Sequence, residues 1–366
     1  MIVTPKMPLE KRLRIRTTVD EDKMESPHPR MIVENMLVSS PSATRRRTDA
    51  GPPPQALGCL FSSVLCDENL FESIMEFCPG VRLKNWTNAI MAARAGHLYI
   101  LQQREKFLKY NSYIFSEASA NGHLHIVRWC HENNKPGCTT DAMDYAAGAG
   151  HLDVVKYLHA NRSEGSTRRA IDFAALRGHL HLIQWLHANR RGVCSSEAMN
   201  SAAFSGHLDI VVWLHKHRKS CTVDAMDSAA GNGHLDVVQF LHSERREGCT
   251  TKAMDFAAKN GHLHVVKWLS SHRKEGCTTK AMDYAAQNGH LHVIEWLHRN
   301  RREGCTTKAM DWAAGAGNLK VFQWLHVHRN EGCTINGVAE AFKQNHRDVM
   351  EFIQNNGIYH GMHPLL

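Results

Sequence analysis

Thr251–Leu269 reads TKAMDFAAKNGHLHVVKWL, and this stretch decides the fold because copies of it recur along most of the chain. Its Gly-His-Leu core is found at eight glycines, continues as Gly317-Asn318-Leu319 and fades at Asn345-His346-Arg347. These eight are Gly96, Gly122, Gly150, Gly178, Gly206, Gly233, Gly261 and Gly289. From Gly122 onward the copies follow at 28 residues, once at 27, whereas the first spacing is 26. Self-similarity at such a period is typical of a solenoid.

Each copy predicts two short helices joined by a turn. The first, as in Thr279–Ala286, opens on threonines that can cap it, and it ends at Asn288-Gly289, where a left-handed residue is easily accommodated. The second, from Leu291 to about Asn300, is expected to bury one apolar face. That face consists of Leu291, Ile294 and Leu297, with Val293 alongside. Neither helix is long enough to be stable alone, so stacking of neighbours must supply the core.

These residues resemble ankyrin repeats. Thr279–Ala286 is similar to the family's Thr-Pro-Leu-His-x-Ala-Ala segment, and Gly289–Leu297 is similar to its Gly-His turn and apolar second helix. The resemblance covers roughly residues 86–357 and implies an all-α α-solenoid of about ten stacked helix-turn-helix repeats. The period is 28 rather than about 33 residues, so we expect a tight loop in place of the family's β-hairpin finger.

The family's Pro-Leu-His becomes Ala-Met-Asp in this chain, which removes the usual Thr-His hydrogen bond. An aspartate column replaces it, and we expect its carboxylates to accept from local threonine hydroxyls or amides. The column contains Asp144, Asp172, Asp227, Asp255, Asp283 and Asp311, with Asn200 in register. A column of seven cysteines, one per repeat, is interpreted as structural: Cys138, Cys194, Cys221, Cys249, Cys277, Cys305 and Cys333.

Four segments are predicted. Residues 1–56 are rich in prolines and basic clusters and are expected to form a disordered leader. Residues 57–85 turn apolar and predict a helical cap over the first repeat, with an F-box-like ubiquitin-ligase adaptor as the alternative. Residues 86–357 form the repeat domain, and residues 358–366 are a short C-terminal tail.

Bulk properties exclude several classes of protein. The 366 residues are 43% hydrophobic and 22% charged, and no apolar run approaches the ~18 residues of a membrane span. The N-terminus has prolines and charges where a secretory signal would be apolar, so we expect a cytoplasmic or nuclear protein with reduced thiols. The net charge of +8 permits acidic partners without requiring nucleic acid.

Neither metal binding nor catalysis is predicted. Although there are 26 histidines, the column cysteines lie one whole repeat apart, whereas a zinc site needs ligands close together. We therefore interpret the Gly-His column as structural, with each imidazole hydrogen-bonded at a helix start. No phosphate loop or nucleophile motif is present, and every candidate Asp or His is repeated many times, unlike an active site. We expect no cofactor and no enzymatic activity.

Aromatic residues also recur in the first helix of five repeats. They are Tyr145, Phe173, Phe256, Tyr284 and Trp312, and the last repeat has Glu340 at this position. A terminal repeat needs a polar outer face because nothing stacks on it. We therefore expect these aromatics to be core residues rather than a base-stacking surface.

The two residues before each Gly-His vary between repeats, and the resemblance implies that this pair lies on the concave face and contacts partners. The expected contact residues are Leu176, Arg177, Phe204, Lys259 and Gln287. Drift at unconstrained positions is the alternative explanation. The predicted function is a monomeric, non-enzymatic scaffold that binds another protein. A weaker hypothesis has nucleic acid or anionic surfaces bound by the basic leader and by Arg190-Arg191, Arg245-Arg246, Arg273-Lys274 and Arg301-Arg302.

Overall fold

A computed structural model describes residues 89–103, 113–190 and 194–358, all within one compact unit, Glu72–Leu366. The predicted leader (1–56), the cap or adaptor segment (57–85) and the tail beyond residue 358 lie outside the described residues. The three boundaries that separate the four predicted segments therefore stay predictions.

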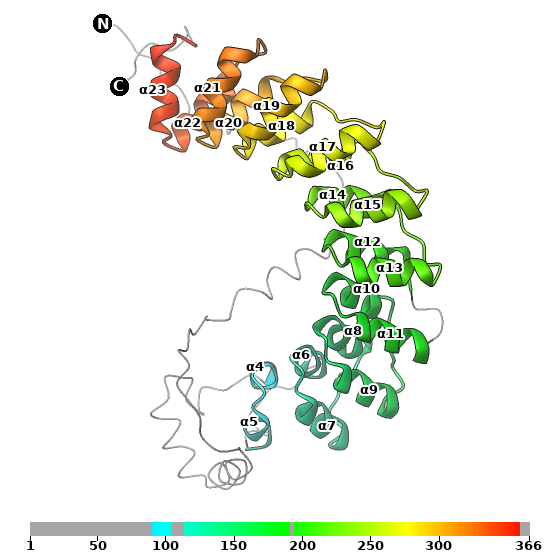
Figure 1. The fold of residues 1–366 in the computed structure, drawn as a ribbon. Helices are drawn as coiled ribbons and strands as arrows, with labels where there is room; N and C mark the ends of the chain where they lie inside the picture. Colours follow the sequence, from blue (N-terminus) through cyan, green and yellow to red (C-terminus); the bar gives the residue numbers. More distant parts are fainter. Residues whose placement is uncertain (1–88, 104–112, 191–193, 359–366) are drawn as a thin grey trace, which may run out of the picture. The chain divides into compact units, whose positions relative to one another are not determined.

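The described residues form twenty helices and no strand, as the all-α expectation requires (Figure 1). The first helices of the ten pairs are α4 (Ala89–Arg94), α6 (Ile114–Ala120), α8 (Thr140–Ala149), α10 (Arg169–Leu176), α12 (Ser196–Phe204), α14 (Val223–Gly231), α16 (Thr251–Lys259), α18 (Lys280–Gln287), α20 (Thr307–Gly315) and α22 (Ile335–Lys343). The second helices are α5 (Leu98–Gln103), α7 (Leu124–Glu132), α9 (Leu152–Asn161), α11 (Leu180–Asn189), α13 (Leu208–Lys216), α15 (Leu235–Glu244), α17 (Leu263–His272), α19 (Leu291–Asn300), α21 (Leu319–His328) and α23 (Arg347–Asn355).

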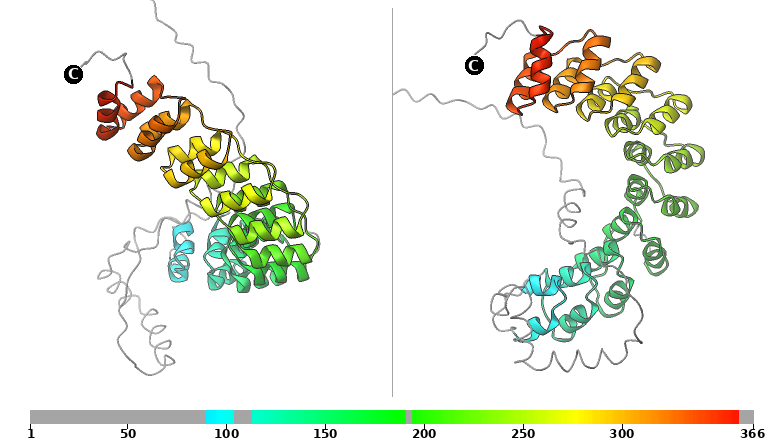
Figure 2. Two further views of the ribbon diagram at one scale, coloured as in Figure 1. Left: turned by 45° about the horizontal axis from the view of Figure 1, so that its top comes forward. Right: turned by 60° about the vertical axis from the view of Figure 1, so that its left-hand side comes forward.

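The pairs stack side by side in two layers (Figure 2). Each first helix packs against the first helices of the neighbouring repeats and against the second helix of its own repeat. The first helices follow one another along the inner side of the row, and the second helices form the outer layer (Figures 1 and 2). This arrangement confirms the predicted α-solenoid.

The core repeats with the sequence. In one repeat the buried residues are Ala253, Met254, Ala257 and Ala258 from α16 and Val265, Val266 and Leu269 from α17, each at most 1% exposed. The small alanines let neighbouring first helices approach closely. One expectation was wrong in detail: Val293 is fully buried, whereas Leu291, at the first position of α19, is only partly buried. Leu291 nevertheless packs against the core.

The predicted helix ends are confirmed. The hydroxyl of Thr250 caps α16 by accepting the amide of Lys252 at 3.1 Å, and Thr278 does the same for Lys280 at 3.2 Å. After α16 the chain turns at Gly261 with φ of 78°, a conformation that favours glycine. The predicted tight loop without a strand is also present, since no strand occurs between consecutive helix pairs in the described ranges.

Candidate functional site

Most of the recurring polar side chains contact an adjacent repeat. A partner protein can bind only to side chains that these contacts between repeats leave exposed. The Asp255 carboxylate accepts the Thr278 amide at 2.8 Å and the Thr278 hydroxyl at 2.7 Å. The same pair of bonds joins Asp144 to Thr167, Asp227 to Thr250, Asp283 to Thr306 and Asp311 to Thr334. The expectation of local threonine partners was wrong, because each threonine caps the next first helix.

The variants of this Asp–Thr bridge keep its geometry. Asn200 accepts the Thr222 amide at 3.1 Å and donates to the Thr222 hydroxyl at 3.0 Å, while Asp172 accepts the Ser195 hydroxyl at 2.8 Å. Burial raises the pKa of the Asp144, Asp227, Asp255 and Asp283 carboxyls, and it raises the pKa of Asp172 to about 6. The bridges therefore hold neighbouring repeats together at the cost of a buried charge.

The Gly-His column is also a contact between repeats. His123 stands just before α7, and its Nε2 bonds the Arg94 carbonyl of the preceding repeat at 3.0 Å. His346 bonds the Gly315 carbonyl in the same way at 3.1 Å. Each of these imidazoles is hydrogen-bonded at a helix start, as predicted. Its hydrogen-bond partner belongs to the preceding repeat, and it makes no cap bond within its own helix. A Cβ on Gly261 would lie 2.8 Å from the ring of His290, which explains the paired repetition of Gly and His.

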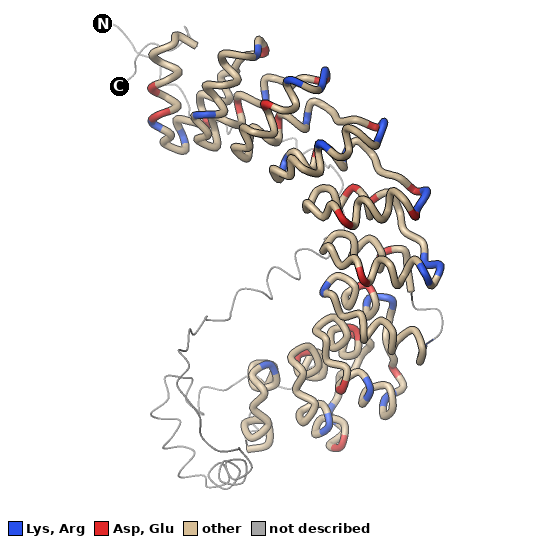
Figure 3. The backbone as a smooth tube through the Cα atoms, in the orientation of Figure 1, with Lys and Arg blue, Asp and Glu red and all other residues tan. Residues whose placement is uncertain are grey.

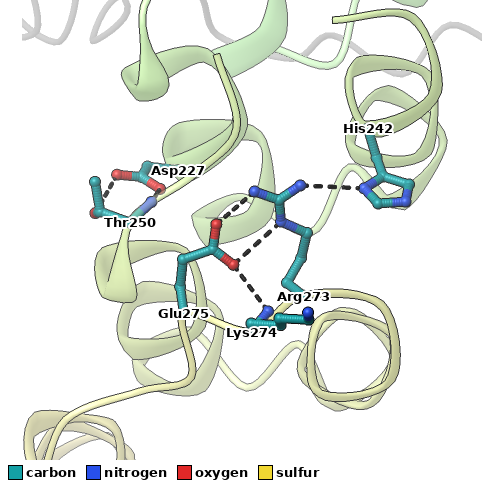
Figure 4. Close-up of polar contacts among 6 residues, drawn as sticks. All are labelled: Asp227, His242, Thr250, Arg273, Lys274 and Glu275. Atoms are coloured by element: carbon teal, nitrogen blue, oxygen red, sulfur yellow. Dashed lines mark hydrogen bonds and ion pairs between the residues drawn. The ribbon is translucent and has the colours of Figure 1, made fainter. Parts of the chain in front are cut away.

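The loops between repeats form a third recurring contact, shown in Figure 4. The guanidinium of Arg273 pairs with Glu275 and lies 3.3 Å from Nδ1 of His242. Equivalent pairs are Arg162–Glu164, Arg245–Glu247, Arg301–Glu303 and Arg329–Glu331. The first arginine of each of these loops is thus partly buried and neutralised, and only its neighbour, such as Lys274, is fully exposed. This weakens the hypothesis that these loops bind nucleic acid.

The cysteine column lies beside these loops and is chemically quiet. Burial raises the pKa of the Cys277 and Cys305 thiols to about 12, so they stay protonated at neutral pH. Across the ranges that the structure describes, no group of three or more His, Cys, Asp or Glu side chains is arranged to hold a metal ion.

The first-helix aromatics are not core residues, contrary to the expectation. Phe256 is 38% exposed, and Tyr145, Phe173, Tyr284 and Trp312 are only partly buried. They lie on the face of each first helix that also carries the exposed residues Lys280 and Gln287, and their rings meet between repeats. The rings of Tyr145 and Phe173, for example, stack with centroids 6.2 Å apart. Their absence from the last repeat therefore shows where the row ends, but it does not show that they are buried.

The exposed and partly exposed side chains of α16, α18 and α20 form a continuous surface, which we call the aromatic–lysine ridge. It consists of Lys252, Phe256, Lys259, Lys280, Tyr284, Gln287, Lys308 and Trp312. The rings of Tyr284 and Trp312 stack with centroids 5.6 Å apart and an interplanar angle of 3°. Lys259 Nζ lies 5.5 Å from the Tyr284 centroid, and Lys308 Nζ lies 5.5 Å from that of Trp312.

The ridge is basic at its surface. Figure 3 shows where Lys and Arg alternate with Asp and Glu along the row. The aspartates of this part of the row are engaged inside it, since Asp255 and Asp283 are 4% and 2% exposed and are bonded to Thr278 and Thr306. Lysine ammonium groups therefore dominate the charge that a partner would meet on these three helices.

The five predicted contact residues fall into two groups. Lys259 and Gln287 belong to the ridge, and Arg177 is exposed at the end of α10. Leu176 and Phe204 are partly buried at positions where other repeats show packing against the next repeat. Their assignment as contact residues stays a prediction.

The packing role of this position is visible where it is glycine. A Cβ on Gly148 would lie 2.7 Å from the Phe173 side chain, and one on Gly231 would lie 2.9 Å from that of Phe256. By the same register, Leu176 faces Ser201 and Phe204 faces Ser228. Leu176 and Phe204 thus stand where the next repeat has a small residue. Packing between repeats can therefore explain these two apolar residues without a binding partner.

Sequence reasoning missed Lys252, Lys280, Lys308 and the exposure of Tyr284 and Trp312. The missing signal is helical spacing, because residues four and seven positions apart share one face. Lys280, Tyr284 and Gln287 follow that spacing. If Gln287 contacts a partner, Lys280 and Tyr284 therefore lie on the same face of the helix.

The family follows from comparison with known proteins. A model of ankyrin repeats in many copies matches residues 115–159, 143–187 and 199–242, and a model of ankyrin repeats in three copies matches residues 226–308 and 254–339. The matches cover more than half of the chain, which therefore belongs to the ankyrin repeat family. Ankyrin repeats are generally protein–protein interaction modules and typically non-enzymatic. A search of curated proteins found no match. None of the helices in the described ranges combines the length and apolarity of a membrane span.

Proposed function

We propose that this protein is a non-enzymatic interaction scaffold that binds a partner protein on the inner face of its first helices, centred on the aromatic–lysine ridge. One observation carries the proposal. Three consecutive repeats gather large aromatic rings and lysines on one face, where these side chains contact one another and stay exposed or partly exposed. Aromatic residues are enriched at protein interfaces, where a few of them supply most of the binding energy.

The extended form of the surface supports a macromolecular partner. The ridge spans three stacked helices rather than converging on one point, and its rings present shallow, partly exposed areas. A small molecule is held in a concave pocket that buries most of its surface, whereas a protein or peptide can contact several repeats at once.

The test is affinity capture from the native cell with mass spectrometry, using matched baits. The first variant changes Phe256→Ser and Tyr284→Ser, which installs the residue that this chain itself has at Ser201 and Ser228. The control variant changes Arg246→Ala and Lys274→Ala in the exposed loop positions. Loss of a partner from the first bait alone supports the proposal. Unchanged capture by a first bait that keeps its helical circular dichroism overturns it.

A third bait tests the earlier contact prediction. It replaces Leu176, Arg177 and Phe204 together with alanine. If these residues only pack against the next repeat, this bait loses stability and retains every partner that the wild type captures. If they bind the partner, capture is lost while the unfolding temperature changes little.

A further inference from the structure

We propose that the aromatic–lysine ridge recognises an extended acidic segment of the partner that places a carboxylate at every third residue. This inference rests on the proposed function and specifies the chemistry of its partner. The first observation that supports it is the charge of the column of residues near the start of the first helices.

The sign of charge in this column changes along the row. From α8 to α14 the column reads Asp141, Arg169, Glu197 and Asp224, and from α16 to α20 it reads Lys252, Lys280 and Lys308. All three lysines are exposed, and no ion pair within the described ranges joins any of them to a carboxylate. Lys259 adds a fourth ammonium group on the same three helices. Carboxylates are therefore the complementary chemistry for this part of the row.

The rings favour an acidic peptide over a nucleic acid. A nucleic-acid base binds an aromatic side chain by stacking on its face. The face of Tyr284 is already in contact with other side chains, since the ring of Trp312 stacks on it and the ammonium group of Lys259 lies over it. What such a ring offers a partner is its edge, and the edge carries the positive end of the ring quadrupole. Ring edges and lysines thus present the same sign of potential.

The spacing sets the pattern of the ligand. The lysines recur once per repeat, and packed helices lie about 8–10 Å apart. An extended polyproline II segment advances about 3.1 Å per residue with three residues per turn, so every third side chain projects from one face at intervals of roughly 9 Å. A segment with acidic residues at i, i+3 and i+6 can therefore place one carboxylate on the lysine of each successive repeat.

The test measures binding of two fluorescein-labelled peptides of identical composition to the full-length protein at several salt concentrations. One peptide repeats Glu-Pro-Gln five times, and the other contains the same residues with the five glutamates contiguous. We expect the spaced peptide to bind the wild type at least about tenfold more tightly, since only it aligns carboxylates with all three helices. Equal affinity for the two peptides would overturn the spacing argument.

Two variants of equal charge locate the binding. The ridge variant changes Lys252, Lys280 and Lys308 to alanine, and the loop variant changes Arg246, Lys274 and Arg302 to alanine. We expect the ridge variant to lose about tenfold or more in affinity for the spaced peptide and the loop variant less than about twofold, because each surface ion pair contributes modestly and three contribute together. Circular dichroism and thermal unfolding confirm that both variants are folded. Equal losses would show a general charge effect and overturn the assignment.

Two further outcomes have a fixed meaning. Single-stranded DNA that binds the wild type more tightly than the spaced peptide does, and that loses this affinity in the ridge variant, would identify a nucleic-acid surface and overturn the inference. A partner that is captured through Phe256 and Tyr284 while neither peptide binds would overturn this inference and leave the proposed function standing.

Discussion

Replacing Asp283 tests whether the Asp–Thr bridge couples neighbouring repeats. Asp283 is 2% exposed, and its carboxylate accepts the amide and the hydroxyl of Thr306 at 2.8 Å each. Asp283→Ala removes both acceptors. Hydrogen bonds to a charged group contribute about 1.5–3 kcal/mol each, and part of that loss is offset because the buried carboxylate no longer has to be desolvated. We expect a net loss of roughly 2–4 kcal/mol.

The chain provides the matched control, because Asn200 makes the equivalent two bonds to Thr222 at 3.1 and 3.0 Å. Asp283→Asn should therefore cost less than about 1 kcal/mol. Urea unfolding followed by tryptophan fluorescence compares the three proteins. If asparagine costs as much as alanine, the bridge acts through its charge and the hydrogen-bond reasoning is refuted.

Hydrogen exchange locates the effect within the row. A solenoid is stabilised by intrinsic repeat terms and by the interfaces between neighbours. Weakening the contact between α18 and α20 by Asp283→Ala should therefore speed exchange in α20–α23, while the amides of α8 and α10 keep their protection. Uniformly faster exchange along the row would show that the repeats unfold as one unit and contradict the local interpretation.

Three further predictions follow from the same contacts. Gly261→Ala should cost roughly 2–4 kcal/mol and Gly332→Ala only about 1 kcal/mol by urea unfolding. Both glycines have φ near 77°, but a Cβ at Gly261 would meet His290, whereas nothing lies within 4 Å at Gly332. Because the pKa of Asp172 is raised to about 6 in the folded protein, this residue stabilises the fold most below pH 3.8, and its contribution is lost as the pH rises through 6. Asp172→Asn should therefore be more stable than the wild type at pH 7, by up to about 3 kcal/mol, but not at pH 4. With a pKa of about 12, Cys277 should react with iodoacetamide at pH 8 on the order of 1,000-fold more slowly in the native protein than in urea, by peptide mass spectrometry.

The repeat period and the helix pattern were sufficient to predict the fold. A stretch such as Thr250–Leu269 contains the capping threonine of its first helix, its turn glycine and its apolar face, and each of these depends on residues close in sequence. The bridges could not be derived in the same way, because Asp255 binds Thr278 in the next repeat at a distance of 23 residues. Asp255 and Thr278 come together only when the repeats stack, and the rotation between stacked repeats cannot be predicted from the sequence of one repeat.

The candidate site was predicted in part for a related reason. The pair of residues before each glycine varies, and Lys259 and Gln287 do belong to the exposed ridge. The polar Glu340 in the last repeat made the aromatic column look like core, yet a side chain that contacts an adjacent repeat can still be open to solvent on its other side. Phe256 illustrates this, since it follows the buried Asp255 in the sequence and is itself 38% exposed.

The ridge is the part of the surface whose residue types are not explained by the contacts between stacked repeats. Asp, Thr, Gly, His, Arg, Glu and Cys of each repeat are bound to the adjacent repeat, and they recur because every interface needs them. Gly148 and Gly231 have a structural reason for their small size, because the next repeat places an aromatic side chain against each of them. Only the column that begins with Asp141 and continues through Lys252 to Lys308 changes its charge without a structural reason in its neighbours. A feature that packing does not require and that three consecutive repeats share is where selection for a partner would act.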